Sequence, residues 1–206
     1  MKTWQSIAWG LGSLAALGVA IYTLGYFTHS EHAPLLKVHS GLNRTVLLIH
    51  IIGSCVAIVT GPTQFLPKLR ARFPKWHRSI GYLYFAGVAI GGGAGLYSAT
   101  VSMGGLVAHV GFFLLALLWL ITAARALAAI RRRNIPLHRE WMVRCYSLTF
   151  AAVTLRLWLP ILTAASGSFD EAYQTVAWLS WVPNLILAEA WNRRSTDHVR
   201  PPLNLK

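Results

Sequence analysis

The longest uncharged stretch of the chain limits its fold most strongly. Between Arg78 and Arg125, 46 consecutive residues include no Asp, Glu, Lys or Arg. A helix needs about 20 predominantly apolar residues to cross the roughly 30 Å hydrocarbon layer of a bilayer. The stretch is therefore long enough for two crossings. Residues 98–105, which end in Gly104-Gly105, are the natural turn between them.

The other gaps between charged residues predict four further membrane helices. Together the expected spans are about 4–27, 45–66, 77–98, 105–127, 138–161 and 172–191. Hydrophobic residues make up 55% of the chain and charged residues only 12%, about half the charged share of a soluble domain. Uninterrupted apolar runs exclude the alternating pattern of a membrane β-barrel. We expect residues 1–206 to form a single all-α membrane bundle of six transmembrane helices.

The positive charges predict how this bundle is oriented. The net charge is +13, and 16 of the 19 Lys and Arg side chains fall at one side of the predicted spans, mostly in the 68–78 and 125–144 connections. Loops rich in Lys and Arg stay in the cytoplasm. Both termini are therefore expected inside, in the cytoplasmic (inner) membrane of a bacterium. Because the charges alternate with apolar spans, they indicate anionic lipid rather than nucleic acid as the partner.

Four histidines fall into a pattern once the spans are oriented. His50 and His109 lie in the second and fourth spans, each about 6–9 Å below the predicted outer boundary. His77 and His138 lie at the inner starts of the third and fifth spans, each shortly after a proline and directly before an arginine. The two hairpins formed by spans two to five therefore look like copies of one unit, which would build a four-helix core.

Two histidines at equal depth on facing helices can hold a haem iron between them. The spacing therefore suggests one haem b bound by His50 and His109 and a second bound by His77 and His138. The glycine-rich run 91–95 would leave space for a planar ring, although close helix packing explains it equally well. The alternative is that the histidines are structural or protonatable and bind no metal.

Two other charged residues fall within predicted spans. Arg156 is expected near the depth of His50 and His109, where it needs an anion. A haem propionate, a lipid phosphate and the Asp170-Glu171 turn are candidates, and the alternative is a side chain that extends to the outer head groups. Glu189 is expected to pair with Arg193, four residues later on the same helix.

Three groups of residues resemble the motifs of a bacterial membrane family, domain of unknown function 2306. They are Gly61-Pro62-x-Gln64-Phe65, His77-Arg78-x-x-Gly81-Tyr82-x-Tyr84 and His138-Arg139-x-Trp141-Met142-x-Arg144-x-Tyr146. The resemblance covers about residues 45–190 and implies a membrane bundle, but no particular activity. The arrangement of the four histidines also resembles that of two-haem, four-helix b-type cytochromes, in topology rather than in motifs.

The sequence therefore favours a membrane-embedded, b-type cytochrome-like electron-transfer protein, either an oxidoreductase or an electron-transfer subunit. Its expected partners are the lipid bilayer, a quinone or another redox partner, and other subunits of a membrane complex. The competing interpretation is a haem-free integral-membrane accessory subunit or small transporter. Gln64, Asn184, Tyr82, Tyr84 and Tyr146 could line a quinone or proton path, or simply form hydrogen bonds between helices.

Overall fold

The structure, a computed structural model, describes residues 3–28 and 40–197, and this part of the chain is helical throughout apart from short turns. In chain order its elements are α1 (Thr3–Thr28), α3 (Gly41–Thr60), η2 (Gly61–Phe65), α4 (Pro67–Arg72), α5 (Pro74–Thr100), α6 (Gly105–Arg131), α7 (Ile135–Thr149), α8 (Ala151–Ser166), α9 (Phe169–Leu179) and α10 (Val182–Asp197). The predicted all-α fold is confirmed for the described residues.

Four stretches are long and apolar enough to cross a membrane, among the residues described. They are Gly41–Phe65, Pro74–Thr100, Gly105–Arg131 and Ile135–Ser166. These match the second to fifth predicted spans. Helix α1 has 26 residues, of which Trp9–Thr23 form an apolar stretch, and the sixth predicted span is divided between α9 and α10.

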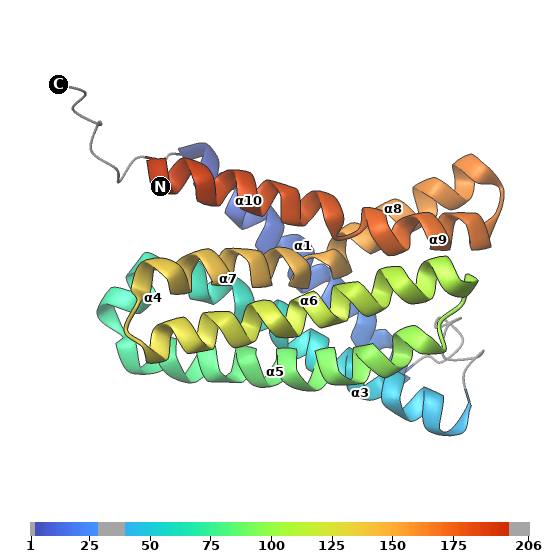
Figure 1. Cartoon of the computed structure of the whole chain (residues 1–206), viewed down its shortest axis with the longest axis horizontal. Helices are drawn as coiled ribbons and strands as arrows, with labels where there is room; N and C mark the ends of the chain where they lie inside the picture. Colours follow the sequence, from blue (N-terminus) through green and yellow to red (C-terminus); the bar gives the residue numbers. More distant parts are fainter. Residues whose placement is uncertain (1–2, 29–39, 198–206) are drawn as a thin grey trace.

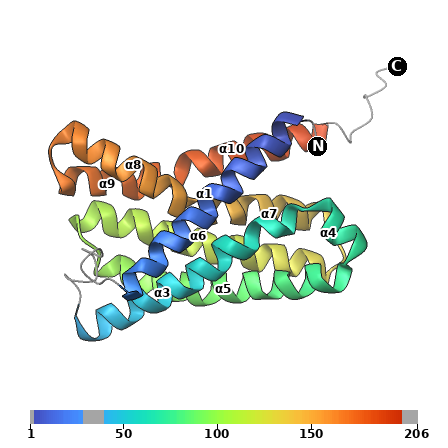
Figure 2. The same ribbon diagram turned by 180° about the vertical axis from the view of Figure 1, so that it is seen from behind.

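The helices form one elongated bundle. In Figure 1, α5, α6 and α7 run beside one another in alternating directions, while Figure 2 shows α1 crossing the opposite face of the bundle near α3. The short helix α4 and the α6–α7 turn lie at one end, which we call the α4 end. The α5–α6 and α8–α9 turns lie at the opposite end. The starts of α5 and α7 therefore meet at the α4 end.

Prolines and a polar cap explain where these two helices begin. Pro74 is the first residue of α5 and Pro136 the second of α7, positions where the missing backbone N–H costs no helical hydrogen bond. The side chain of Asn134 accepts a hydrogen bond from the Leu137 backbone N–H at 3.1 Å, which caps α7. Each of these two helices carries a histidine in its first turn.

Glycines bring the backbones of α3 and α5 into direct contact. A Cβ atom added to Gly53 would lie 2.8 Å from the Cα of Gly91 and 2.9 Å from the carbonyl oxygen of Gly87. A Cβ added to Gly87 would lie 2.8 Å from the Gly53 oxygen. Small residues at such contacts allow membrane helices to approach closely. We call Gly53, Gly87 and Gly91 the glycine seam.

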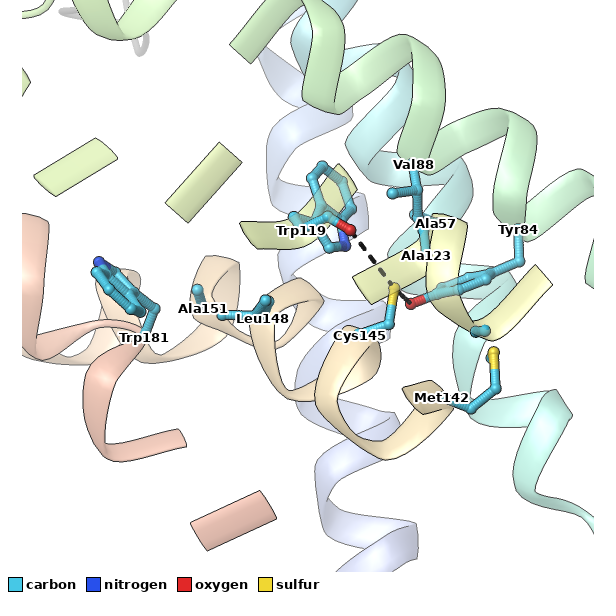
Figure 3. Packing of buried hydrophobic residues seen from close by; sticks show 11 residues of the cluster. Ala57, Tyr84, Val88, Trp119, Ala123, Met142, Cys145, Leu148, Ala151 and Trp181 are labelled. Carbon is cyan, nitrogen blue, oxygen red and sulfur yellow. Dashed lines mark hydrogen bonds between the residues drawn. The ribbon is translucent and has the colours of Figure 1, made fainter. Parts of the chain in front are cut away.

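A buried polar network joins α5, α6 and α7 at the centre of the core. The Tyr84 hydroxyl lies 3.1 Å from the Cys145 sulfur and 2.9 Å from the Thr149 hydroxyl, and the Trp119 indole N–H donates to that same hydroxyl at 2.9 Å. Figure 3 shows Tyr84, Cys145 and Trp119 converging from three helices. These hydrogen bonds satisfy polar groups that would otherwise be costly to bury.

A charged contact fastens α10 to α7. The Arg144 guanidinium donates two hydrogen bonds to the Glu189 carboxylate, one of them from Nη2 to Oε2 at 2.9 Å, and lies 3.6 Å from Glu140. Such two-pronged arginine–carboxylate pairs are geometrically specific. The predicted pairing of Glu189 with Arg193 is wrong, because Arg144 on the neighbouring helix presents the better matched donor pair. Helix spacing alone does not reveal such a partner.

The glycine seam predicts a large difference between two glycine substitutions in the same bundle. Gly53→Ala should lower the unfolding free energy by about 1–3 kcal/mol, because the added methyl group would overlap the α5 backbone. Gly93→Ala is the matched control, since nothing lies within 4 Å of its added Cβ. Thermal unfolding of both variants in detergent measures the difference. Equal stability of the two would show that the helices do not meet at this seam.

Candidate functional site

The structure gives different hydrogen bonds to the two histidines predicted as the outer haem pair. His50 Nδ1 lies 2.7 Å from the Gly91 carbonyl oxygen on α5, and His109 Nε2 lies 2.7 Å from the Ser102 carbonyl oxygen in the α5–α6 turn. A carbonyl oxygen can only accept, so each of these nitrogens carries the hydrogen. A neutral His50 therefore keeps its lone pair on Nε2, whereas a neutral His109 keeps it on Nδ1.

The two outer histidines do not share a depth in the bundle. A Cβ added to Gly95 would lie 2.9 Å from His50 Nδ1 and 3.5 Å from the Ala116 Cβ, so the His50 ring lies at the level of Ala116. Ala116 follows His109 by seven residues, or two turns of α6, which is about 10 Å. The expectation of equal depth is not met. The structure does not bring His50 and His109 together.

Packing fills the space beside Gly91, Gly92 and Gly95 of the glycine-rich run, whereas Gly93 is exposed. Gly91 meets the α3 backbone at Ser54, and a Cβ on Gly92 would lie 2.7 Å from the Leu120 side chain. Gly95 accommodates the imidazole of His50 itself. Of the two interpretations of this run, close packing is therefore the one that the structure supports.

The two inner histidines, in contrast, lie near each other at the α4 end. His77 is in the first turn of α5 and His138 in the first turn of α7, and the two rings are close enough to interact electrostatically. His138 Nδ1 donates to the Ala126 carbonyl oxygen of α6 at 2.8 Å, which leaves its Nε2 lone pair free. His77 Nδ1 is buried and has no hydrogen-bond partner in the described part of the chain.

Further polar and sulfur-containing side chains lie deeper in the bundle, on the same two helices as this pair. Two turns beyond His77 on α5 is Tyr84, and two turns beyond His138 on α7 is Cys145, so the central polar network lies about 10 Å deeper on the same helix faces. Met142 lies between His138 and Cys145 and packs in the same core. The repeated histidines in the sequence did not predict this network, because its residues are of types that are common in the core of any helical bundle.

The three resembling motifs also converge here. A Cβ on Gly61 would overlap the Tyr146 ring, and one on Gly81 would lie 3.1 Å from the Gln64 side-chain oxygen. The rings of Phe65 and Tyr146 are 5.4 Å apart. Both glycines therefore leave room for a polar or aromatic side chain of another motif. Segments distant in sequence thus form one region beside His77.

Arg156 lies close enough to His50 for its charge to act on that ring. Its charge acts on His50 and on Cys55, while its Nη2 donates to the Thr23 hydroxyl of α1 at 3.0 Å and its Nη1 to the Ala152 carbonyl oxygen at 2.9 Å. Asp170 and Glu171 are exposed in the first turn of α9, and the ion pairs found among the described residues belong to Arg144. The predicted pairing with that acidic turn is not seen.

Other polar residues considered for a path through the membrane bind neighbouring helices. The Asn184 amide donates to the Ser147 carbonyl oxygen at 3.3 Å and to the Thr154 hydroxyl at 3.1 Å. Tyr84 belongs to the central network, and Tyr82 is exposed at the bundle surface. No group of three or more His, Cys, Asp or Glu side chains within 3–28 and 40–197 is arranged to hold a metal ion. Of the predicted ligands, His77 and His138 lie at the same end of the bundle, whereas His50 and His109 lie at different depths.

Comparison with known proteins gives a family but no individual relative. Neither the curated proteins nor the solved structures contain a match to this chain. The model of one family, described as "Predicted membrane protein (DUF2306)", matches residues 47–192, which include α5 to α9 and most of α3 and α10. The matched region contains all three motifs and all four histidines discussed above. The chain therefore belongs to this family of predicted membrane proteins.

Proposed function

We propose that the chain is a membrane-embedded, b-type cytochrome-like electron-transfer protein that holds haem between His77 and His138. The observation that carries this proposal is that both imidazoles lie in the first turn of their helices, α5 and α7, which start at the same end of the bundle. Imidazole pairs on neighbouring helices are a common way to bind haem iron in helical bundles. The exposed aromatic and basic side chains around this end would face the propionates and the membrane surface.

The hydrogen bond of His138 suits this role. Metal-binding histidines usually donate the N–H of their other nitrogen to a carbonyl, which fixes the ring and raises its basicity. His138 makes such a bond to Ala126. His77 Nδ1 is a buried polar atom without a described partner, and such atoms are uncommon in folded proteins. A bound haem would supply one-electron transfer, while this chain orients the ligands and excludes lipid.

One haem at the α4 end would exchange electrons on one side of the membrane. His50 and His109 differ in depth, and the Nε2 of His109 already donates to Ser102, so a second haem between them would require at least the His109 ring to rearrange. The proposal therefore includes the inner haem only. Its redox partner would be a quinone or a neighbouring protein of a membrane complex, reached from the α4 end.

We further propose six membrane passes, with both termini in the bacterial cytoplasm. The 26-residue helix α1 and the consecutive helices α9 and α10 would supply the two passes beyond the four candidate spans. The starts of α1 and α5 and the end of α10 lie at the α4 end, and so do the basic residues of α4 and of the α6–α7 turn. The positive-inside rule supports placing that end in the cytoplasm.

A haem-free integral-membrane protein is the second candidate function. Two of the four histidines bind backbone carbonyls of α5 or of the turn that follows it, at 2.7 Å each, and so serve the packing of α3 and α6. In such an accessory subunit or transporter, His77 and His138 would be structural or would take up protons instead of binding iron.

Optical spectra distinguish these two functions. Protein purified from haem-replete cells should show a Soret band and a reduced α-band, and either His77→Ala or His138→Ala should remove both bands because one axial ligand is lost. His109→Ala is the matched control and should retain the bands, since its ring binds Ser102. A folded but colourless wild-type protein, or full haem retention in both inner variants, would refute the proposed site.

Reporter fusions test the proposed orientation. Fusions after Lys75 and after Arg133 should behave as cytoplasmic, because translocation of the adjacent cationic residues would oppose the usual charge bias. A fusion after Ser168, in the α8–α9 turn, should behave as external. Green fluorescent protein reports a cytoplasmic position, and alkaline phosphatase, whose disulfides form only outside the cytoplasm, reports an external one. Reversal of all three would refute the orientation.

A further inference from the structure

Arg156 carries a positive charge inside the bundle without a described negative partner. It lies ten residues, about 15 Å, before the end of α8 at Ser166, within one of the membrane-length stretches. The described ion pairs are those of Arg144 with Glu140 and Glu189, on α7 and α10. An arginine in a low-dielectric region is costly unless an anion or ordered water compensates it.

The surroundings direct this side chain inward rather than to the membrane surface. Its Nη2 donates to the hydroxyl of Thr23, which is 2% exposed and itself donates to the Val19 carbonyl oxygen. The contact lies one turn beyond the apolar cluster of Ala20 and Val153, where α1 packs on α8. An arginine extending to the head groups would not bond to a buried threonine of another helix.

The guanidinium still has donors available. It has five N–H groups, and its two described hydrogen bonds use one on Nη1 and one on Nη2. Its Nε is buried and has no described partner. A carboxylate or phosphate oxygen would accept from these remaining groups and supply the missing charge.

The neighbouring surface indicates what carries that oxyanion. Apolar side chains of α1 and α8 near the contact are exposed on the outside of the bundle, including Leu17 and Ile21 on α1 and Leu157 and Ile161 on α8, which are 47–61% exposed. Within a bilayer these side chains meet acyl chains. A ligand with an anionic head and an apolar chain matches both parts of the site.

We propose that Arg156 and Thr23 form a binding site for an anionic amphiphile between α1 and α8. Its phosphate or carboxylate binds the Arg156 guanidinium, and its hydrocarbon chain lies along the exposed apolar residues of the two helices. This site is at the other half of the bundle from His77 and His138 and does not depend on haem. It connects α1 to the remainder of the bundle through a ligand as well as through side-chain packing.

Delipidated full-length protein in a non-ionic detergent tests this proposal. Four additives are compared by thermal unfolding and native mass spectrometry: phosphatidylglycerol, oleate, phosphatidylcholine and inorganic phosphate. Phosphatidylglycerol or oleate should bind saturably and raise the unfolding midpoint by several degrees, because binding to the folded state stabilises it. Phosphatidylcholine and inorganic phosphate should not. Whichever of the first two acts identifies the head group as phosphate or carboxylate.

Matched variants locate the effect. Arg156→Gln should abolish the shift and the bound mass, whereas Arg125→Gln, which removes an exposed arginine of α6, should leave both unchanged. Thr23→Val keeps the charge and the side-chain size, and should raise the half-saturating concentration several-fold. It also tests the site if Arg156→Gln fails to fold. An equal response in wild type and Arg156→Gln, or the same stabilisation by inorganic phosphate alone, would overturn the proposal.

Discussion

The direct backbone contact between α3 and α5 is the constraint on which the remaining arrangement depends. Because Gly53, Gly87 and Gly91 remove the side chains between these helices, the ring of His50 can reach the Gly91 carbonyl oxygen and lie against Gly95. Helix α5 is thereby fixed as the common neighbour of α3 and α6. The same helix carries His77 at its start and Tyr84 two turns later, so the seam also determines where the proposed haem ligand and the central network lie.

Arg144 and Arg156, both within the α7–α8 stretch, show two ways of accommodating a positive charge in a bilayer. Arg144 is neutralised inside the chain by Glu189 and Glu140 and also lies over the Trp141 ring. Arg156 has only neutral acceptors among its described contacts. Since an unpaired charge in a low-dielectric region is costly, the first arginine is a structural connection between helices. The second retains the capacity to bind something else.

The sequence predicted the spans better than it predicted the site. Uncharged stretches long enough to cross a bilayer predicted the positions of α3, α5 and α6 to within a few residues. Pro136 marked the start of α7. The breaks after Thr149 and Leu179 were missed, because neither a charge nor a glycine marks them. The prediction that His50 and His109 lie at equal depth was wrong. It was made by counting residues from the predicted ends of the spans, which assumes that both helices are parallel and begin at the same level in the membrane. The partner of Glu189 was wrong because the nearest cation lies on another helix.

The inner histidines illustrate why a repeated motif need not give repeated chemistry. Both follow a helix-starting proline, yet His138 is turned toward the Ala126 carbonyl oxygen of α6, whereas His77 Nδ1 has no described acceptor. Ala126 lies five residues before the end of α6, about 7–8 Å inside the bundle. His138 therefore lies below the basic α6–α7 turn but above the apolar centre, where a bound haem would be partly shielded from lipid and still reachable from the membrane surface. A position of this kind suits electron exchange at one face better than transfer through the whole bundle.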